Sequence, residues 1–186
     1  MASMKNQALF SSQSEEWETP QELFDRLNAL YGFALDACAK PVNAKCAHYF
    51  TKADDALSKD WSAYGRVWMN PPYGRPIGKW MKKAFEESLK GCLVACLVPA
   101  RTDTRWWHDW VLDKGSVTFI KGRLRFNRTD ASKDELIYPA PFPNVIVVYE
   151  PNIYQVVNAS DDRHGRPDGV VVRTTGFGAT QRQCAN

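Results

Sequence analysis

Apolar residues recur at helical spacing along two segments of the chain. The first begins at Thr19-Pro20-Gln21-Glu22, where Thr19 is a favourable N-cap, proline suits the first helical position, glutamate completes a capping box, and Gly32 supplies a stop. The second extends from Ile77 to Leu89, with apolar residues on one face and lysine and glutamate residues, Glu87 among them, on the other. The pattern predicts two amphipathic helices.

Shorter apolar runs alternate with these helices. Strands are expected at residues 33–36, 66–69, 92–98, 117–126 and 144–149, with one more short strand within 47–50. A third helix carries Trp106, Trp107 and Trp110, whose helical spacing favours packing in the core over stacking on a nucleotide base, and it stops near Gly115. The alternation predicts an α/β protein: a three-layer sandwich with a mostly parallel sheet and an antiparallel pair at its end.

Composition limits the class of protein. A chain of 186 residues with 44% hydrophobic and 24% charged residues is long and apolar enough for one folded domain and is not disordered or coiled-coil. We expect a domain over residues 16–157, a flexible segment before it (1–15) and a polar tail after it (158–186). No apolar run approaches the roughly 20 residues that cross a bilayer, so no membrane contact is expected.

The five cysteines lack a paired C-x-x-C spacing. The pattern therefore predicts neither a metal site nor a disulfide framework, and it fits reduced thiols in a cytoplasm.

The net charge of +3 is too small to name a partner, so the placement of the basic residues matters more. Three basic residues, Lys121, Arg123 and Arg125, occupy alternate positions in the expected strand 117–126 and would share one face of it. That face is either a contact for nucleic-acid phosphates or a solvated sheet edge protected by charge. The candidate residues are Arg101, Arg105, Lys121, Arg123 and Arg125.

Two polar residues come at the ends of expected strands. Asp36 closes the strand 33–36, and Asn70 follows the strand 66–69. In open α/β sheets, ligands bind beyond the carboxyl ends of the strands, so the two side chains are expected to share one cleft. Asn70 also opens the sequence Asn-Pro-Pro-Tyr, which combines an amide, two rigid residues and an aromatic ring.

This combination suits a planar exocyclic amine, such as that of adenine, whose lone pair is delocalised into the ring. If the Asn70 side-chain oxygen and the Pro71 carbonyl each accept one amine hydrogen, the nitrogen moves toward tetrahedral geometry and its lone pair is freed toward an incoming methyl group. Pro72 helps to hold that carbonyl still, and Tyr73 is placed to stack on the base. The alternative is an ordinary turn, which asparagine and proline also favour.

The sequence resembles the small phage and prophage DNA N-6-adenine methyltransferases, a family of the class I fold that uses S-adenosylmethionine. The resemblance spans roughly residues 16–150 and rests on the order and joint presence of five segments. They are Trp17-Glu18-Thr19-Pro20, Leu35-Asp36-Ala37-Cys38-Ala39, Asn70-Pro71-Pro72-Tyr73, Leu97-Val98-Pro99-Ala100-Arg101-Thr102-Asp103-Thr104 and Gly122-Arg123-Leu124-Arg125-Phe126.

The family implies a Rossmann-like class I sandwich, methyl transfer to the position 6 amine of adenine in double-stranded DNA, and S-adenosylhomocysteine as the second product. It also implies a bacteriophage origin, a place in the host cytoplasm and no metal. By position, residues 70–73 become the catalytic motif. If the sheet is trimmed between Asp36 and Asn70, either Asp54 or Asp55 would supply the carboxylate for the cofactor ribose. The other implied cofactor contacts are Trp17, Thr19, Pro20, Asp36, Ala37 and Cys38.

The chain departs from the family pattern beside Asp36. The wider fold usually has a glycine-rich turn there, whereas Ala37-Cys38-Ala39 supplies only small residues. Asn70 follows Asp36 by only 34 positions, which is short for the strand and helix units that usually intervene. The spacing predicts a trimmed sheet.

Three functions fit these residues. The favoured one is a DNA adenine methyltransferase with a short or relaxed target sequence, acting as a monomer or weak dimer. The nearest alternative is a methyltransferase for another planar amine: cytosine, RNA adenine or a protein glutamine side chain. The third is a nucleic-acid-binding module that keeps the fold without catalysis.

Overall fold

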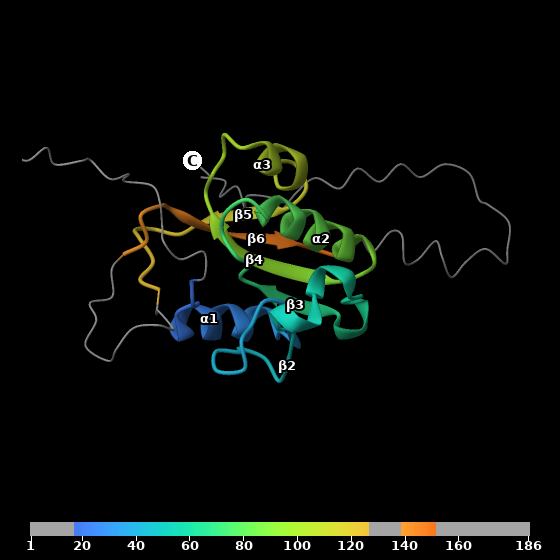
Figure 1. Cartoon of the computed structure of the whole chain (residues 1–186). Helices are drawn as coiled ribbons and strands as arrows, with labels where there is room; N and C mark the ends of the chain where they lie inside the picture. Colours follow the sequence, from blue (N-terminus) through green and yellow to red (C-terminus); the bar gives the residue numbers. More distant parts are fainter. Residues whose placement is uncertain (1–16, 127–138, 152–186) are drawn as a thin grey trace, which may run out of the picture.

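The structure is a computed structural model, described here for residues 17–126 and 139–151 (Figure 1). The expected terminal segments 1–15 and 158–186 lie outside the described residues, as does Cys184. No helix in the described ranges is long and apolar enough to cross a membrane.

A six-stranded sheet with the order β2-β1-β3-β4-β6-β5 forms the centre of the molecule. Strands β1 to β4 are mutually parallel, whereas β6 runs antiparallel to both of its neighbours, β4 and β5. This confirms a mixed α/β fold with an antiparallel pair at one end. The strands are β1 (Leu35–Asp36), β2 (His48–Tyr49), β3 (Arg66–Met69), β4 (Leu93–Pro99), β5 (Ser116–Phe119) and β6 (Asn144–Tyr149).

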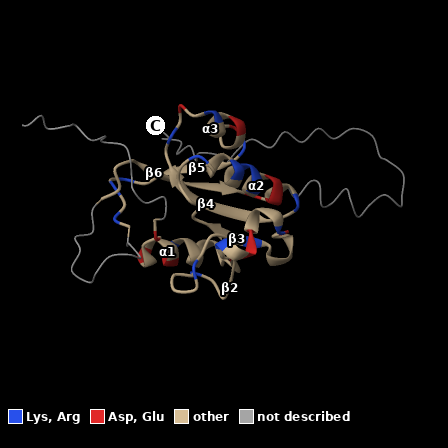
Figure 2. Ribbon diagram, viewed as in Figure 1, with Lys and Arg blue, Asp and Glu red and all other residues tan. Residues whose placement is uncertain are grey.

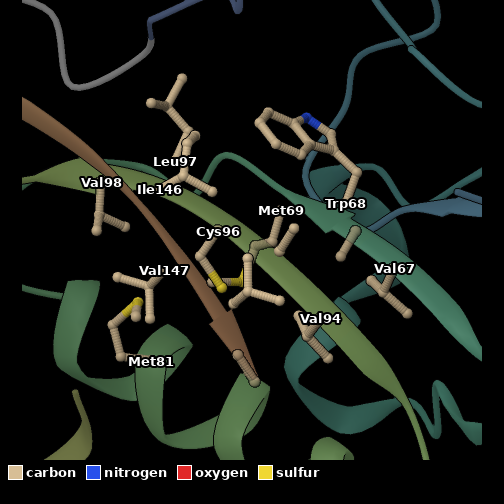
Figure 3. Packing of buried hydrophobic residues seen from close by; sticks show 14 of the residues in the cluster. Val67, Trp68, Met69, Met81, Val94, Cys96, Leu97, Val98, Ile146 and Val147 are labelled. Atoms are coloured by element: carbon tan, nitrogen blue, oxygen red, sulfur yellow. The ribbon is translucent and has the colours of Figure 1, made fainter. Parts of the chain in front are cut away.

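Helices α1 (Gln21–Tyr31) and α2 (Ile77–Leu89) pack on opposite faces of the sheet. The Trp68 ring of β3 lies 5.7 Å from the Phe24 ring of α1. Figure 3 shows Trp68 and Leu97 projecting from one face, while Cys96 projects from the other toward Met81 of α2. Alternation along the strands thus divides the buried side chains between the two helices.

The third helix, α3 (Arg105–Trp110), packs beside α2. Trp107 is buried, and the Trp110 ring lies 6.1 Å from the Phe85 ring of α2. The Tyr149 hydroxyl donates a hydrogen bond of 2.6 Å to the Trp110 carbonyl. Trp106 packs against the same core, so the prediction that these tryptophans are core residues is confirmed.

The segment between β1 and β3 contains no α-helix. Residues 37–65, all of them described, form β2 and three short 3-10 helices: η1 (Lys52–Asp54), η2 (Ala56–Ser58) and η3 (Ser62–Tyr64). The absence of an α-helix here accounts for the short spacing between Asp36 and Asn70.

The strand expected at 117–126 is wrong in length, because β5 ends at Phe119. Gly122 has a φ of +82°, a left-handed conformation that a strand does not contain, and Arg125 forms only an isolated bridge with Pro139. The basic residues of this segment therefore do not share the face of one strand. Their side chains are nevertheless exposed: Lys121, Arg123 and Arg125.

The capping box expected at the start of α1 is also wrong. The N-cap is Pro20, without a side-chain hydrogen bond to the helix, and the Pro20 carbonyl accepts the Phe24 N–H at 3.2 Å. The Thr19 hydroxyl is occupied elsewhere, because it accepts a hydrogen bond from Asn70. Gly32 ends the helix in the left-handed conformation that its position predicts, with a φ of +64°.

Glu87, expected on the solvated face of α2, is fully buried. Its carboxylate accepts hydrogen bonds from the Trp61 N–H at 2.9 Å, from Lys83 at 2.6 Å and from Lys90 at 2.8 Å. Leu89 is 41% exposed instead. The prediction failed because the chain around Trp61 covers this turn of the helix, and helical periodicity does not report such a cover.

Candidate functional site

A cavity of about 930 Å³ lies at the carboxyl ends of three neighbouring strands. Its walls include residues 36–41, which begin at the end of β1, residues 50–53 after β2, and residues 70–72 after β3. This volume is typical of sites that hold a small organic ligand. Asp36 and Asn70 both line the cavity, as their places at the ends of adjacent parallel strands predicted.

The Asn70 amide is fixed by two acceptors from the segment before α1. Its Nδ2 donates one short hydrogen bond to the Trp17 carbonyl and another, of 3.0 Å, to the Thr19 hydroxyl oxygen. A carbonyl oxygen only accepts, so Nδ2 must face Trp17, which settles the orientation of the amide. Both Trp17 and Thr19 also line the cavity.

This arrangement leaves the Asn70 Oδ1 atom buried and without a hydrogen-bond partner among the described residues. A buried acceptor without a donor costs about 1–3 kcal/mol. Oδ1 is therefore prepared to accept a hydrogen from an incoming group, and this is the property that the motif predicted for an amine-binding asparagine.

The Tyr73 ring does not line the cavity. It is 5% exposed, lies 6.3 Å from the Phe126 ring and 5.6 Å from the Phe142 ring, and its hydroxyl donates a hydrogen bond of 3.2 Å to the Leu97 carbonyl. Trp17 packs against the same two phenylalanines. We call these four residues, Trp17, Tyr73, Phe126 and Phe142, the aromatic cluster.

Asp36 holds the loop that follows it. Its two carboxylate oxygens accept the Cys38 N–H at 3.2 Å and the Lys45 N–H at 3.1 Å. Burial raises the pKa of this carboxyl, opposed by the two backbone hydrogen bonds and by the Lys45 charge. Asp36 therefore shapes the wall from which Ala37 and Cys38 face the cavity.

Of the two aspartates that the sequence offers as the ribose-binding carboxylate, only one lines the cavity. Asp55 lines the cavity, in a left-handed conformation with a φ of +49°. Asp54 does not line it, and its carboxylate accepts both the N–H and the hydroxyl of Thr51, which lowers its pKa. Pro20 does not line the cavity either.

The described cysteines do not form a reactive or metal-binding group. Burial raises the pKa of the Cys46 thiol to about 12, with a smaller contribution from the Asp36 charge, and raises the pKa of Cys38 and Cys96 as well. Cys38, Cys46, Cys92 and Cys96 are free thiols. Among residues 17–126 and 139–151, no cluster of histidine, cysteine and acidic side chains has the arrangement of a metal site.

Four charged residues of the cavity wall were not among the sequence candidates: Glu18, Lys40, Lys45 and Lys52. Glu18 lies between Trp17 and Thr19, which were both candidate cofactor contacts, so the sequence indicated its neighbourhood. Lys45 lies in a polar stretch without periodicity, and only the fold shows that its backbone is tied to Asp36. No sequence signal indicated it.

The basic candidates lie at the same edge of the sheet as Asn70. Arg101 follows β4, whose carboxyl end lies at the same edge as that of β3, and Arg105 begins α3; both are exposed. The other three follow β5, which runs in the same direction as β4 because both are antiparallel to β6. Figure 2 shows basic residues on the segment beyond β5 and around α3.

Comparison with known proteins yields one family and several relatives. The family described as DNA N-6-adenine-methyltransferase (Dam) matches residues 7–166. A DNA N-6-adenine-methyltransferase of Escherichia phage T1 is 31% identical over 109 residues, which are 58% of this chain and 45% of the phage protein. One of Haemophilus phage HP1 (strain HP1c1) is 28% identical over 146 residues, 75% of this chain and 81% of that protein. The chain thus spans less than half the length of the phage T1 relative.

Proposed function

Because the chain belongs to the DNA N-6-adenine-methyltransferase (Dam) family, we propose that it transfers a methyl group from S-adenosylmethionine to the position 6 amine of adenine in double-stranded DNA. The fold is then a Rossmann-like class I sandwich, with helices on both faces of a sheet that is trimmed between β1 and β3. The second product is S-adenosylhomocysteine. The phage relatives support a phage origin and action in a host cytoplasm.

The observation that carries the proposal is the held Asn70 amide. Trp17 and Thr19 take both hydrogen bonds of its Nδ2, so that the buried Oδ1 is left as a fixed acceptor at the end of β3. An amide oxygen accepts a hydrogen from an exocyclic amine without taking the proton away. This acceptor is what distinguishes the site from an ordinary Asn-Pro turn, in which the asparagine oxygen bonds to its own backbone.

The cavity supplies groups suited to the cofactor. Asp55 suits the ribose hydroxyls, since a carboxylate accepts hydrogen bonds from a diol, and Thr19 with the 37–38 wall suits the methionine end. When bound, S-adenosylmethionine supplies an electrophilic methyl group on a positively charged sulfur. The wall lies directly beside Asn70, so donor and acceptor sites adjoin.

The chemistry that the chain contributes is electrostatic. Asn70 Oδ1 and the Pro71 carbonyl each accept one hydrogen of the target amine, which draws the nitrogen toward tetrahedral geometry. The dipoles of these two groups also stabilise the positive charge that develops on that nitrogen. Pro72 restricts the backbone that carries the Pro71 carbonyl. The positively charged nitrogen left after transfer is strongly acidic and releases one hydrogen as a proton to water, so no strongly basic side chain is required.

Base capture requires a change at the aromatic cluster. The Tyr73 ring is packed among Phe126 and Phe142, and Oδ1 of Asn70 is covered. A base swung out of the duplex would stack on Tyr73 only after the ring leaves these contacts. The exposed Arg101, Arg105, Lys121, Arg123 and Arg125 would hold the DNA backbone at this edge of the sheet.

The test is transfer of labelled methyl from S-adenosylmethionine to unmethylated duplex DNA, followed by digestion to nucleosides and mass identification. Label in N-6-methyladenine supports the proposal. Label only in cytosine, in RNA or in protein would overturn the proposed substrate, and no label in any of them would overturn the proposed activity.

A further inference from the structure

Glu18 and Lys45 form a pair of opposite charges within the wall of the cavity. The Lys45 ammonium lies 4.0 Å from a Glu18 carboxylate oxygen, at the limit of an ion pair, and donates a hydrogen bond of 2.9 Å to the Gln21 side-chain oxygen. The Lys45 side chain is only 9% exposed and the Glu18 side chain 19%. Both residues line the cavity beside Thr19.

Two charged side chains with so little exposed surface are costly unless they are well paired. Here the pairing is incomplete, because the separation of 4.0 Å exceeds the 2.7–2.9 Å of a charge-assisted hydrogen bond. The pair therefore retains capacity for further partners. A ligand that carries both a carboxylate and an ammonium group would complete both members at once.

Asp36 does not fill this role. Both of its oxygens already accept backbone N–H groups, and the residue is 3% exposed. Asp55 comes after β2 in the stretch of the chain that also brings Lys52 to the wall, whereas Glu18 precedes α1 and adjoins Thr19 in the chain. Glu18 is thus the carboxylate next to Thr19 that is left for a cationic ligand group.

We infer that Glu18 and Lys45 recognise the charged amino-acid end of S-adenosylmethionine, Glu18 taking the ammonium group and Lys45 the carboxylate. The inference rests on the proposed function. It makes Lys45 a specificity residue that separates the cofactor from nucleosides with the same sulfur and adenine but no carboxylate. The hydrogen bond that the Lys45 backbone N–H donates to the Asp36 carboxylate holds Lys45 near the end of β1.

The test is calorimetric binding of three nucleosides to the full chain. S-Adenosylmethionine carries both charged groups, decarboxylated S-adenosylmethionine keeps only the ammonium, and 5′-methylthioadenosine has neither. A charge-assisted hydrogen bond predicts that the wild-type protein prefers S-adenosylmethionine over the decarboxylated form by about 10- to 100-fold.

Lys45→Met should remove this preference by weakening only S-adenosylmethionine, since loss of the lysine leaves Glu18 free for the ammonium group of the decarboxylated form. Glu18→Gln should weaken both charged ligands. Neither variant should change the binding of 5′-methylthioadenosine. Lys52→Met, a matched variant on the part of the wall after β2, should keep the preference.

Equal weakening of the first two ligands in Lys45→Met, or loss of the preference in Lys52→Met, would overturn the inference. If Lys45→Met also loses binding of 5′-methylthioadenosine, the variant is damaged and the test depends on the wild-type protein alone. Equal affinity of the wild-type protein for S-adenosylmethionine and its decarboxylated form would then contradict the role of Lys45. A wild-type protein that binds none of the three would instead overturn the proposed function.

Discussion

The Thr19 hydroxyl contacts the candidate site instead of capping the helix that follows it. At the start of a helix, a threonine is ordinarily an N-cap, yet here its oxygen accepts a hydrogen bond from Asn70, and α1 begins without a side-chain cap. The sequence placed Thr19 correctly beside the helix but assigned its hydroxyl to the wrong partner. Local preference alone does not reveal a contact with a residue so distant in the chain.

Replacing Thr19 by valine should therefore affect the rate more than the fold. Valine keeps the shape but leaves Asn70 Nδ2 with only the Trp17 carbonyl, so we expect kcat for methyl transfer to fall about 2- to 10-fold, the value of one hydrogen bond. The KM for S-adenosylmethionine should change less than kcat. Thr19→Ser keeps the hydroxyl and should restore the rate, and an unchanged kcat in Thr19→Val would contradict the positioning role.

Two variants of Tyr73 distinguish stacking by its ring from hydrogen bonding by its hydroxyl. Tyr73→Leu removes the stacking surface and should raise the KM for DNA by about tenfold or more, since stacking on one base is worth about 1–3 kcal/mol. Tyr73→Phe keeps the ring, loses the hydroxyl that donates to the Leu97 carbonyl, and should keep a KM near that of the wild type. Steady-state kinetics with varied DNA would check this. Equal KM values for wild type and Tyr73→Leu would exclude base stacking.

Helices and strands with a regular apolar pattern were predicted well, whereas the end of a strand near a backbone turn was not. Residues 77–89 have a strong apolar stripe and form α2 over the same range, and residues 144–149 form β6. The strand expected at 117–126 stops at Phe119, because the left-handed Gly122 interrupts the alternation. Periodicity reports which face is buried, but it does not report where the backbone turns.

Glu87 ties α2 to the segment between β1 and β3. Glu87→Ala should lower the free energy of unfolding by roughly 1–3 kcal/mol, because the buried Trp61 N–H loses its acceptor. Glu86→Ala, one residue earlier, removes only a partly exposed pair with Lys82 and should cost less than about 1 kcal/mol. Urea denaturation of both variants measures the difference. Equal losses would show that the hydrogen bond to Trp61 does not stabilise the fold.

At the scale of the molecule, the parallel strands gather the chemistry at one edge of the sheet. The place of Asp36 and Asn70 in a shared cavity followed from sequence, since both come at the ends of strands. The place of Lys45 did not, because it depends on how the loop after β1 folds back on Asp36. The closed aromatic cluster was also beyond prediction, since Phe126 and Phe142 meet Tyr73 only through the tertiary fold.

The same edge should hold DNA phosphates. Removing a positive charge at this edge should therefore change the salt dependence of DNA binding, whereas removing one at the opposite edge should not. Arg123→Ala removes one exposed charge beyond β5 and should reduce the slope of log K against log salt by about 0.9, the value of one phosphate contact. Lys114→Ala removes an exposed charge before β5, at the opposite edge, and should leave the slope unchanged. The opposite order of effects would place the DNA on the other edge.

The central claim is that the held Asn70 oxygen activates the target amine, and Asn70→Ala tests it most directly. Methyl transfer to duplex DNA and binding of S-adenosylmethionine would be measured on the same preparations of wild type and variant. The account predicts that transfer is lost in the variant while the cofactor binds with near wild-type affinity, because the acceptor is gone and the cavity wall remains. A variant that still methylates adenine at the wild-type rate would contradict the account.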